Sequence, residues 1–350
     1  MKILILHAYS AENAGDGLLV SETLALVKEA LGDDLDITML ASRPDSFSHL
    51  PIESFPSVPT LRGYDRRFLT TLRSINSFDL VVGVGGGYLR AGNLKEAAKT
   101  LLVQGPQLLA ASRARTPTIY LPQSVGPVKF GARRGLRSVI AHIDEFSLRD
   151  DRSVSEFSGK STKRTPDLAA AGVLSGRTPG SVPDSTPVVS IRAVRGTVSR
   201  PVYELADQLG TYDAYIQSTT GGNNDVPATE TLSPRAVLPR RELMTPGGTP
   251  RVVVAVRLHA ALMALAAGHY VVHLAYERKG FGAYSDLGIS RWVHNVNRFD
   301  PAAVAAQVHE LLTNPGTRAE YDEALTLSGP RLERERTAIM HRIRRLASGA

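Results

Sequence analysis

The sequence predicts a two-domain α/β protein in which each domain is built on a doubly wound parallel sheet. A chain of 350 residues is too long for a domain with one ordinary core and has about the length of two domains of typical size. Short apolar runs typical of buried parallel strands alternate with helical stretches, as they do in doubly wound sheets. A stretch rich in Pro, Gly and Ser, 175–187, interrupts this alternation, and we take it as the linker between the domains.

The expected strands and helices follow from the apolar periodicity. In the first half we expect strands over 3–6, 37–40, 80–84 and 118–121, and helices over 17–31 and 94–111. In the second half we expect strands over 188–191, 214–216, 252–256 and 270–274. The apolar residues of 331–346 fall near one helical face, which predicts a terminal helix that packs back on the protein.

These expectations give a domain over 1–175, a second domain over 188–317 and a helical tail over 318–350. The polar segment 219–250 is rich in Gly and Pro and is too long for an ordinary connection between a helix and a strand. It is therefore either a functional lid or a disordered insert.

The sequence contains no cysteine. Disulfides, thiolate nucleophiles and sulfur-ligated metals are therefore excluded, and a reducing compartment, the cytoplasm, is expected. The apolar run over 1–9 is too short for a secretory signal and is expected to form a buried strand. No later stretch approaches the roughly 20 apolar residues of a membrane-spanning helix, so we expect no membrane span.

The formal net charge of +7 raises the question of nucleic acid binding. We interpret the basic residues, which are mostly arginines, as spread along the chain, without the interleaved aromatic residues that stack on bases. No nucleic acid partner is therefore expected. Arginine forks bind carboxylates and phosphates bidentately, which favours an anionic small-molecule substrate.

Polar residues follow the first expected strand. Asn13 and Asp16 stand among glycines just before the helix expected over 17–31. A helix N-terminus carries unpaired backbone N–H groups, which bind either a ligand or a capping side chain. Asn13 is thus a candidate ligand contact, and Asp16 is either a functional carboxylate or simply the helix cap.

Three glycines follow the strand expected over 80–84. Parallel α/β sheets bind ligands at the carboxyl ends of their strands, and Gly85, Gly86 and Gly87 allow a close approach of the backbone there. Tyr88 stands where a dinucleotide fingerprint requires its third glycine, so the run is not that fingerprint. The alternative is a tight turn between strand and helix.

A rigid loop follows the strand expected over 118–121. Gln123 and Ser124 lie between two prolines in Pro122-Gln123-Ser124-Val125-Gly126-Pro127, and such loops often present hydrogen-bonding groups to ligands. Further on, Arg149 and Asp150 end a short strand, and a local ion-pair network is the favoured interpretation of these two residues.

Arg257 and His259 come directly after the strand expected over 252–256 and open an apolar helix. The positive end of a helix disfavours cations, so an arginine and a histidine are expected there chiefly if an anion binds. No histidine pair has the spacing of a zinc site, and no G-x-S-x-G elbow is present. Neither a metal site nor a serine hydrolase is therefore expected.

Taken in order, these motifs resemble the polysaccharide pyruvyltransferase family. The resemblance rests on Asn13-x-Gly15-Asp16, Gly85-Gly86-Gly87, Pro122-Gln123-Ser124-Val125-Gly126-Pro127, Arg149-Asp150-x-x-Ser153, Pro166-Asp167, Arg257-x-His259 and Tyr276-x-x-Lys279. The sequence departs from the family pattern at Gly268-His269-Tyr270, where the family commonly has a proline two residues after the glycine. The polar segment 219–250 also looks unlike the family core.

The resemblance implies two Rossmann-like domains that face a cleft, as in GT-B glycosyltransferases, and transfer of pyruvate from phosphoenolpyruvate to a sugar diol as a cyclic ketal. It connects Arg257 and His259 with the donor, and Arg192 is similar to a family arginine. The expected catalytic residues are His259, as the acid that protonates the donor, and Asp16. The expected substrate contacts are Arg192, Arg257, Asn13, Gly85, Gly86, Gly87, Gln123, Ser124 and Lys279.

The expected partners are phosphoenolpyruvate, as co-substrate without a further cofactor, and a sugar-containing acceptor. We expect the first domain to bind the acceptor and the second domain to bind phosphoenolpyruvate. The acceptor is a glycan unit, a lipid-linked sugar that brings the protein into peripheral contact with a membrane, or a glycosylated metabolite. The alternatives are a GT-B glycosyltransferase with a nucleotide-sugar donor and a non-catalytic sugar-binding or scaffold protein.

Overall fold

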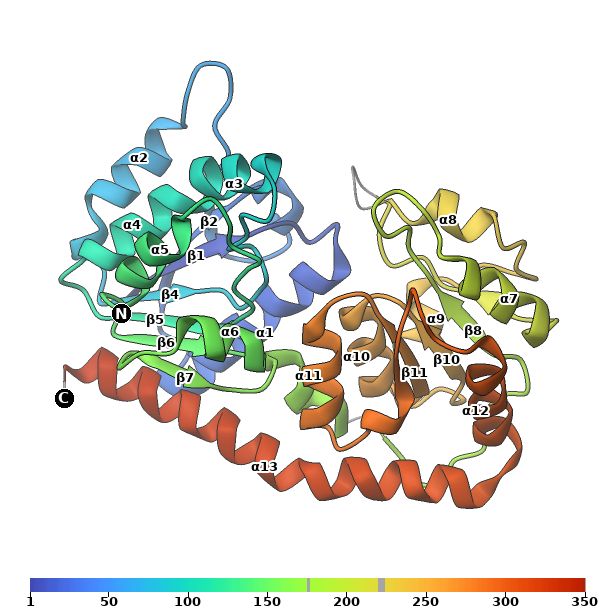
Figure 1. The fold of residues 1–350 in the computed structure, drawn as a ribbon. Helices are drawn as coiled ribbons and strands as arrows, with labels where there is room; N and C mark the ends of the chain where they lie inside the picture. Colours follow the sequence, from blue (N-terminus) through green and yellow to red (C-terminus); the bar gives the residue numbers. More distant parts are fainter. Residues whose placement is uncertain (175–176, 220–223, 350) are drawn as a thin grey trace. The chain divides into compact units, whose positions relative to one another are not determined.

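The computed structural model describes residues 1–174, 177–219 and 224–349. Within these residues the chain forms two compact units. The first unit contains Met1–Ala11, Asp16–Leu168 and the chain from Arg334 onward, and the second contains Glu12–Gly15 and Ala169–Glu333. Each unit has its own sheet (Figure 1), so the prediction of an α/β fold with two parallel sheets is confirmed.

The first unit contains, among its described residues, a seven-stranded sheet in the order β3-β2-β1-β4-β5-β6-β7, in which every pair of neighbours is parallel. The strand order reverses between β1 and β4, the place where open α/β sheets bind ligands. The strands are β1 (Lys2–Ala8), β2 (Asp36–Ala41), β3 (Glu53–Pro56), β4 (Leu80–Gly83), β5 (Thr118–Gln123), β6 (Glu145–Leu148) and β7 (Thr162–Arg164).

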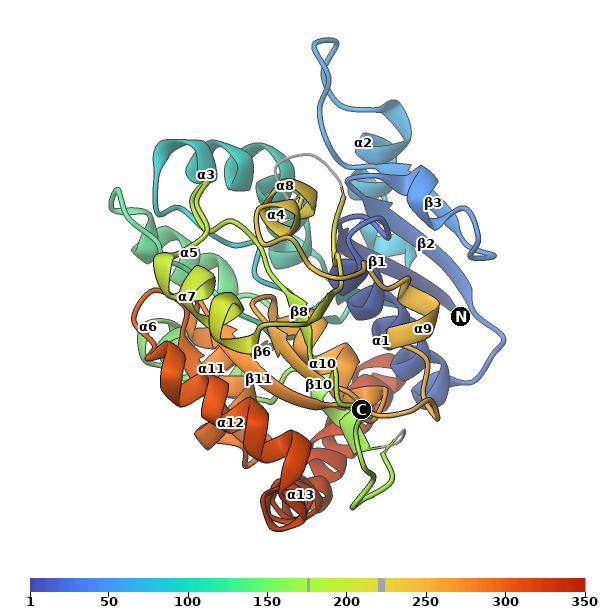
Figure 2. The same ribbon diagram turned by 90° about the vertical axis from the view of Figure 1, so that its right-hand side faces the viewer.

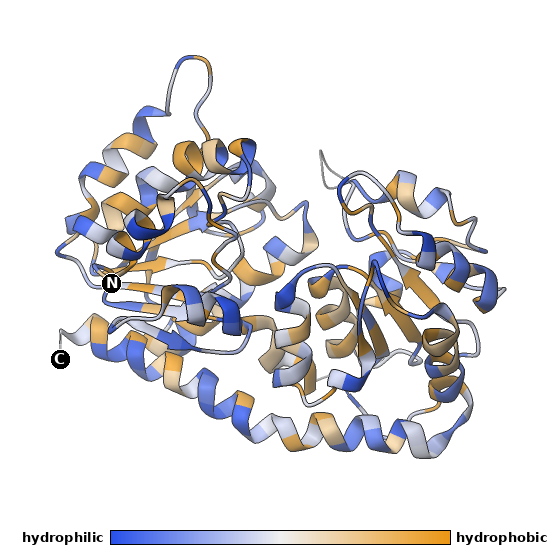
Figure 3. Ribbon diagram, in the orientation of Figure 1, coloured by the Kyte–Doolittle hydropathy of each residue, from blue (hydrophilic) through white to orange (hydrophobic). Residues whose placement is uncertain are grey.

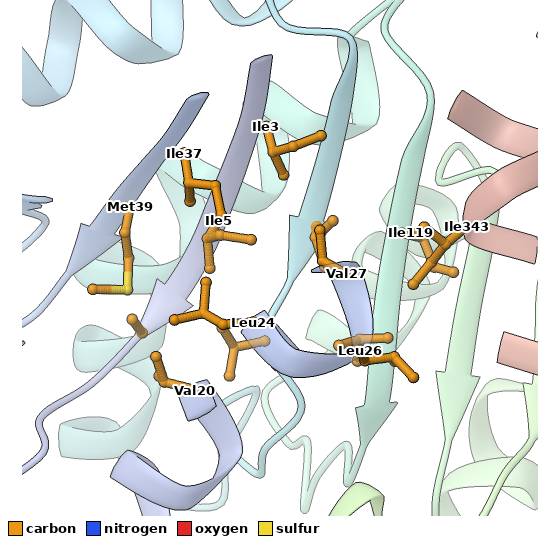
Figure 4. Close-up of a cluster of buried hydrophobic side chains, with 14 of the residues drawn as sticks. Ile3, Ile5, Val20, Leu24, Leu26, Val27, Ile37, Met39, Ile119 and Ile343 are labelled. Carbon is orange, nitrogen blue, oxygen red and sulfur yellow. The ribbon is translucent and has the colours of Figure 1, made fainter. Parts of the chain in front are cut away.

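Helices cover both faces of this sheet because the side chains of each strand alternate between the faces. Ile3 and Ile5 of β1 point toward α1 (Ala14–Leu31), as Figure 4 shows, and belong to one apolar cluster. Leu4 and Leu6 belong to the cluster on the other face. That face is covered by α2 (Arg66–Arg73), α4 (Gly105–Arg113) and α5 (Ala132–Ile140).

Shorter helical segments connect these elements. They are η1 (Pro44–Phe47), η2 (Ile75–Ser77), α3 (Leu94–Lys99), the π-helical turn η3 (Thr100–Gln104) and α6 (Asp151–Phe157). A further segment, η4 (Leu168–Leu174), leads from the first unit into the second. The helix expected over 94–111 is thus one helical stretch, α3-η3-α4, with a π-helical turn in its middle. Such turns are rare and often lie at functional sites.

The second unit contains, in the part of the chain that is described, a five-stranded parallel sheet in the order β12-β11-β10-β8-β9. Its strands are β8 (Val188–Ser190), β9 (Asp213–Ala214), β10 (Val252–Ala255), β11 (Tyr270–Ala275) and β12 (Val293–Asn295). Its helical segments are α7 (Arg200–Leu209), α8 (Val226–Glu230), α9 (Arg240–Leu243), α10 (Leu258–Ala266), α11 (Arg278–Asp286), η6 (Ser290–Trp292) and α12 (Pro301–Thr313). The order reverses between β8 and β10, which marks the ligand edge of this sheet.

The long last helix, α13 (Pro315–Ser348), contains Pro330 and is divided between the two units at Arg334. In the first unit, its Ile339 and Ile343 are buried in the cluster that also contains Val27 (Figure 4). None of the described helices is long and apolar enough to span a membrane. The helix is longer than the segment 331–346 from which it was predicted.

The polar segment 219–250 is structured in its described part. Residues 224–250 include α8 and α9, and Ala228, Leu232 and Leu243 in this part are buried. The backbone around Val237 pairs with β9. Of the two alternatives for this segment, a disordered insert is therefore wrong for residues 224–250; residues 220–223 lie outside the described residues, as do residues 175–176 of the expected linker.

Candidate active site

The ligand edge of the second unit carries two arginines at the point where the strand order reverses. β8 and β10 are parallel neighbours, with Ser190 opposite Ala255, and each strand ends at that residue. Arg192 and Arg257 each stand two residues beyond these ends, on opposite sides of the switch point. Sequence alone predicted both residues as substrate contacts, and the sheet topology places both at this edge.

Tyr276 orients Arg192. It follows directly on β11, the neighbour of β10 on the other side. Arg192 donates a hydrogen bond from Nη1 to the Tyr276 hydroxyl at 3.0 Å, and its guanidinium lies over the tyrosine ring, 5.1 Å from the centroid. The cation–π contact and the hydrogen bond together hold the Arg192 guanidinium in a defined position.

Arg257 is bound by a carboxylate that the sequence analysis did not single out. It precedes α10 at the N-cap position, and its Nε and Nη2 donate to the two oxygens of Asp225 at 2.6 and 2.7 Å. Both residues are buried. The anion expected at this helix N-terminus is thus supplied, in this structure, by the chain itself.

The pKa of Asp225 is raised above its usual value because burial outweighs the hydrogen bonds from Arg257 and the positive charges of Arg257 and Arg192. Asp225 lies in the polar segment 219–250, next to two asparagines. No periodicity or motif distinguishes it there, and its pairing with Arg257 becomes visible only in the folded chain.

His259 lies in the first turn of α10 and is half-buried. Within the second unit, Gly15 packs against its ring: a Cβ atom at Gly15 would stand 2.5 Å from Nδ1 and 2.8 Å from Cγ of His259. Only glycine therefore fits at position 15. Asn13 accepts a hydrogen bond from the Gly15 backbone at 3.2 Å, so the motif that contains Asn13 and Gly15 meets the motif that contains His259.

Asp16 belongs to the first unit and lies in the first turn of α1, which begins at Ala14. It is therefore not the residue that directly precedes the helix. Asn13, which directly precedes α1, has its side-chain oxygen on the Gly15 backbone instead. The Asp16 carboxylate is half-buried at this helix N-terminus.

Lys279 lies in the first turn of α11, with its Nζ 3.0 Å from a carboxylate oxygen of Glu277. Its positive charge contributes to the environment of His273, a histidine buried in β11. Burial is the main cause that lowers the pKa of His273 to about 4, and the charge of Lys279 acts in the same direction. His273 is therefore neutral near pH 7.

At the ligand edge of the first unit, the glycine run is hydrogen-bonded to the loop after β5. The Gly86 backbone donates to Pro122 at 3.2 Å, and the Ser124 backbone donates to Gly86 at 2.7 Å. A Cβ atom at Gly85 would stand 3.1 Å from the Pro122 oxygen. The glycines thus permit a close approach of two backbone segments; the alternative of a tight turn between strand and helix is wrong, because the next helix begins only at Leu94.

Gln123 is fully buried. Its amide nitrogen donates to the Val84 oxygen at 2.6 Å and to the Tyr88 hydroxyl at 2.8 Å. Among the described residues, its Oε1 finds no hydrogen-bond partner. The buried Gln123 therefore connects the loop after β5 with the glycine run after β4. Ser124, which follows it, is half-buried.

Arg149, which follows β6, holds the loop after β5 through a hydrogen bond to Ser124. Its Nε donates to the Ser124 hydroxyl oxygen at 2.9 Å and its Nη1 to Asp167 at 2.5 Å. Its Nη2 would stand 3.5 Å from a Cβ atom at Gly87 and has no partner in the described parts of the chain. Because Arg149 occupies an acceptor position of Ser124, the serine can direct its own proton outward.

The local ion-pair network expected for Arg149 and Asp150 forms around Arg149, which pairs with Asp167, but it does not include Asp150. Asp150 caps α6 instead: its carboxylate accepts from the Ser153 backbone at 2.9 Å and from the Ser153 hydroxyl at 2.7 Å. The short turn around Asp167 thus supplies the partner of Arg149, 18 residues further along the chain.

A buried polar cluster that the sequence did not reveal lies at the end of β1. His7 has a positive φ of 66°, and its Nδ1 is 2.7 Å from Gln104 Oε1 while its Nε2 is 2.8 Å from the Tyr120 hydroxyl. Its ring stacks on Tyr88, 4.7 Å between centroids. Burial lowers the pKa of His7 to about 4, with the bond to Gln104 acting in the opposite direction, so the ring is neutral near pH 7.

His7 lies in the left-handed backbone region, which stores strain. Because its ring is neutral, the direction of both of its hydrogen bonds is fixed. Nδ1–H donates to Gln104, which the π-helical turn η3 carries, and Nε2 accepts from Tyr120. The described residues contain no group of three or more His, Asp or Glu side chains placed to hold a metal ion.

The fold and these two ligand edges define a class: a protein of two Rossmann-like α/β units with the GT-B fold. A glycosyltransferase from Rickettsia africae ESF-5 is similar over 100% of this chain and 99% of its own, with 10% sequence identity and a TM-score of 0.62. A trehalose-6-phosphate protein from E. coli, bound to UDP-2-fluoro glucose, covers 98% and 99% with 11% identity and a TM-score of 0.55. The glycosyltransferase VinC, in complex with DTDP, covers 100% of both chains with 12% identity and a TM-score of 0.53.

The sequence identifies the family within this fold. The polysaccharide pyruvyl transferase family matches residues 13–221, which is more than half of the chain, and the chain belongs to this family. The predicted resemblance is thereby confirmed. A comparison with curated proteins gives no match.

Proposed function

We propose that the protein transfers pyruvate from phosphoenolpyruvate to two hydroxyl groups of a sugar, forming a cyclic ketal and releasing phosphate. Membership of the polysaccharide pyruvyl transferase family supports a transferase reaction with a polysaccharide-related acceptor. The observation that carries the finer proposal is the placement of Arg192, Arg257 and His259 around the switch point of the second sheet. Two guanidinium groups and an imidazole suit a substrate with a carboxylate and a phosphate.

In this proposal Arg192 and Arg257 bind the donor, and His259 is the general acid. The two anionic groups of the donor favour the protonated form of a neighbouring imidazole. His259 gives its proton to the methylene carbon, and the adjoining carbon becomes cationic. A sugar hydroxyl attacks that carbon and loses its proton, and the bond to the phosphate oxygen breaks with its electron pair on the phosphate. A second hydroxyl then attacks the same carbon and loses its proton, which closes the ketal; of the two released protons, one restores His259 and the other leaves with phosphate.

Asp225 acts on Arg257 as a positioning residue. A bidentate carboxylate holds a guanidinium in one plane, so the donor meets an arginine that is already oriented. The raised pKa of Asp225 is consistent with a carboxylate that is buried beside the site rather than solvated. Its bond to Arg257 also limits how much of the guanidinium the donor can use.

For the acceptor we propose contacts in the first unit. Ser124 offers a hydroxyl proton, Gly87 lies on the same loop pair and is half-buried, and Asp16 is the carboxylate that orients the diol and accepts a proton from it. The cysteine-free sequence supports a cytoplasmic location for this reaction.

The test is phosphate release from phosphoenolpyruvate in the presence of a panel of sugars, lipid-linked sugars and glycosylated metabolites, followed by mass detection of the pyruvylated product. We expect phosphate release that depends on one class of acceptor. Nucleotide sugars are assayed in parallel with the same acceptors. Turnover of a nucleotide sugar without turnover of phosphoenolpyruvate would assign the protein to the glycosyltransferase alternative, and stabilisation by sugar without turnover of either donor would assign it to the binding-protein alternative.

A further inference from the structure

Positive charge is concentrated in one segment of the first unit. Residues 61–137 contain 13 Lys and Arg and 3 Asp and Glu, a net charge of +10. The whole chain carries 41 basic and 34 acidic residues, so the remaining residues carry 28 and 31, a net charge of −3. The interpretation of the basic residues as spread along the chain is therefore wrong.

The same segment folds into three helices that lie side by side. α2 packs on α4, and α4 packs on α5, on the face of the sheet opposite α1 (Figure 1). Figure 2 shows α2 beside the edge strand β3. Their inner sides form the apolar cluster around Phe68 and Leu108. We call their outward side, together with η3 and the loop before α5, the α2–α4–α5 face.

This face exposes apolar side chains in addition to charge. Leu101 is 69% exposed, Leu102 is 50% exposed and Phe130 is 61% exposed. Between α2 and α4 lies an open groove of about 420 Å³ with an arginine from each helix beside its leucines. The leucines and arginines that line this groove are Leu69, Leu72, Arg73, Leu101, Leu109 and Arg113.

Exposed basic residues lie on the same elements as these apolar groups. Arg66, Arg67 and Arg73 of α2 are exposed, as are Arg113 of α4 and Lys129 before α5. On α5, the exposed basic residues are Arg133, Arg134 and Arg137. Figure 3 shows hydrophilic and hydrophobic residues interspersed along α2 and α4.

We propose that the α2–α4–α5 face binds peripherally to the surface of an anionic lipid bilayer. Exposed leucines and a phenylalanine enter the boundary between headgroups and acyl chains, and arginines and lysines contact the negative headgroups. Stable interfacial binding requires both an apolar and an electrostatic contribution, and this face has both. A second copy of the chain is disfavoured as the occupant, since it would bring two faces of the same strong positive charge together.

The test uses the full-length protein and phosphatidylcholine vesicles with or without phosphatidylglycerol, in a co-sedimentation assay without phosphoenolpyruvate or sugar. The result is thus independent of the proposed reaction. We expect binding to the vesicles that contain phosphatidylglycerol and little binding to phosphatidylcholine alone, with weaker binding at higher salt.

Two sets of substitutions separate the contributions. L101S with L102S removes exposed apolar groups, and R133S with R134S and R137S removes exposed charges. Each set should lower the bound fraction by about tenfold or more. The matched controls are L327S, at a leucine that is 74% exposed on α13, and R200S with R291S, at exposed arginines of the second unit; both should bind as the unsubstituted protein does. Circular dichroism and thermal unfolding establish that every variant folds.

Several results would overturn the proposal. Equal binding to vesicles without phosphatidylglycerol would do so, as would binding that survives both sets of substitutions. Loss with the arginine set but not with the leucine set would indicate a polyanion such as a charged glycan or a nucleic acid. A concentration-dependent dimer that L101S with L102S abolishes in light scattering would assign the face to a second copy of the chain.

Discussion

The ligand edges of the two sheets differ in charge although both occur where the strand order reverses. In the second unit, Arg192, Arg257 and His259 gather at the ends of two neighbouring strands. In the first unit, glycines and Ser124 face the edge, and Arg149 is engaged beneath them by Asp167 and Ser124. The same architecture thus carries arginines and a histidine at one edge and mainly glycines and a serine at the other, and the proposed division of donor and acceptor between the two units rests on this difference.

The largest expected effect comes from the imidazole of His259. His259→Gln keeps the approximate size and polarity of the side chain but removes the acid, and a general acid contributes about 10² to 10⁴ in rate. Phosphate release from phosphoenolpyruvate should therefore fall by about 1000-fold with unchanged thermal stability. His309→Gln, on the exposed side of α12, is the control and should retain full activity. Near-normal turnover of H259Q would exclude the acid role.

The second effect concerns stability, and in each unit burial lowers the pKa of a histidine to about 4; burial also lowers the pKa of His269 in the second unit. The pKa values of His7 and His273 are each lowered to about 4 from an ordinary value of 6.5. Between these values the unfolded chain binds more protons than the folded chain, so stability is fully present above about pH 6.5 and is lost as the pH falls toward 4. His7 and His273 should each cost about 3 kcal/mol across this window.

Urea denaturation at a series of pH values between 7 and 4.5 measures this loss. His7→Asn and His273→Asn should each flatten the dependence, and the two substitutions together should flatten it further, with His269 contributing to what remains. If the dependence were unchanged in both variants, the buried histidines would not be the groups that titrate, and carboxylates would have to account for it.

The third effect tests whether Gly15 influences catalysis through its contact with His259. In Gly15→Ala the new Cβ atom would stand 2.5 Å from Nδ1 of His259, so the ring must move. We expect kcat to fall by about tenfold with a loss of stability of about 1–3 kcal/mol. Gly135→Ala, where a Cβ atom meets nothing within 4 Å, is the matched control and should slightly stabilise α5. Unchanged kcat in G15A would show that His259 tolerates displacement.

The smallest effect belongs to Ser124 at the edge of the first unit. Ser124→Ala removes one neutral hydrogen bond to the acceptor, which is worth about 0.5–1.5 kcal/mol. The KM for the sugar should rise by roughly 2- to 10-fold, while the KM for phosphoenolpyruvate stays constant. Ser138→Ala, on the exposed side of α5, should leave both constants unchanged. A rise in the KM for phosphoenolpyruvate instead would place Ser124 on the donor side and contradict the division of roles.

The sequence predicted the central strands better than the edge strands. The runs 3–6, 80–84 and 252–256 are continuously apolar because these strands are buried on both faces, and β1, β4 and β10 lie there. The edge strands β3, β7 and β12 were not predicted. Each is short and partly exposed at a sheet margin, so no apolar run marks it.

Some residues of the candidate site could likewise be predicted from the sequence, and others could not. Arg257 and His259 were found because they stand beside a strand and a helix start that are visible locally. Asp225 lies 32 residues from Arg257 and Gln104 lies 97 residues from His7, in segments without a distinguishing pattern. Their roles follow from which segments the fold brings together.

By itself, the sequence determined the α/β class, the central strands and the motif residues that follow them, because burial and helix ends leave periodic and local marks on a chain. The tertiary structure alone decided the strand order, and with it which strand ends become neighbours. It also decided that Asp225 pairs with Arg257 and that Arg149 turns to Asp167 rather than to Asp150. Such partners are selected by packing across long sequence separations, which no local pattern encodes.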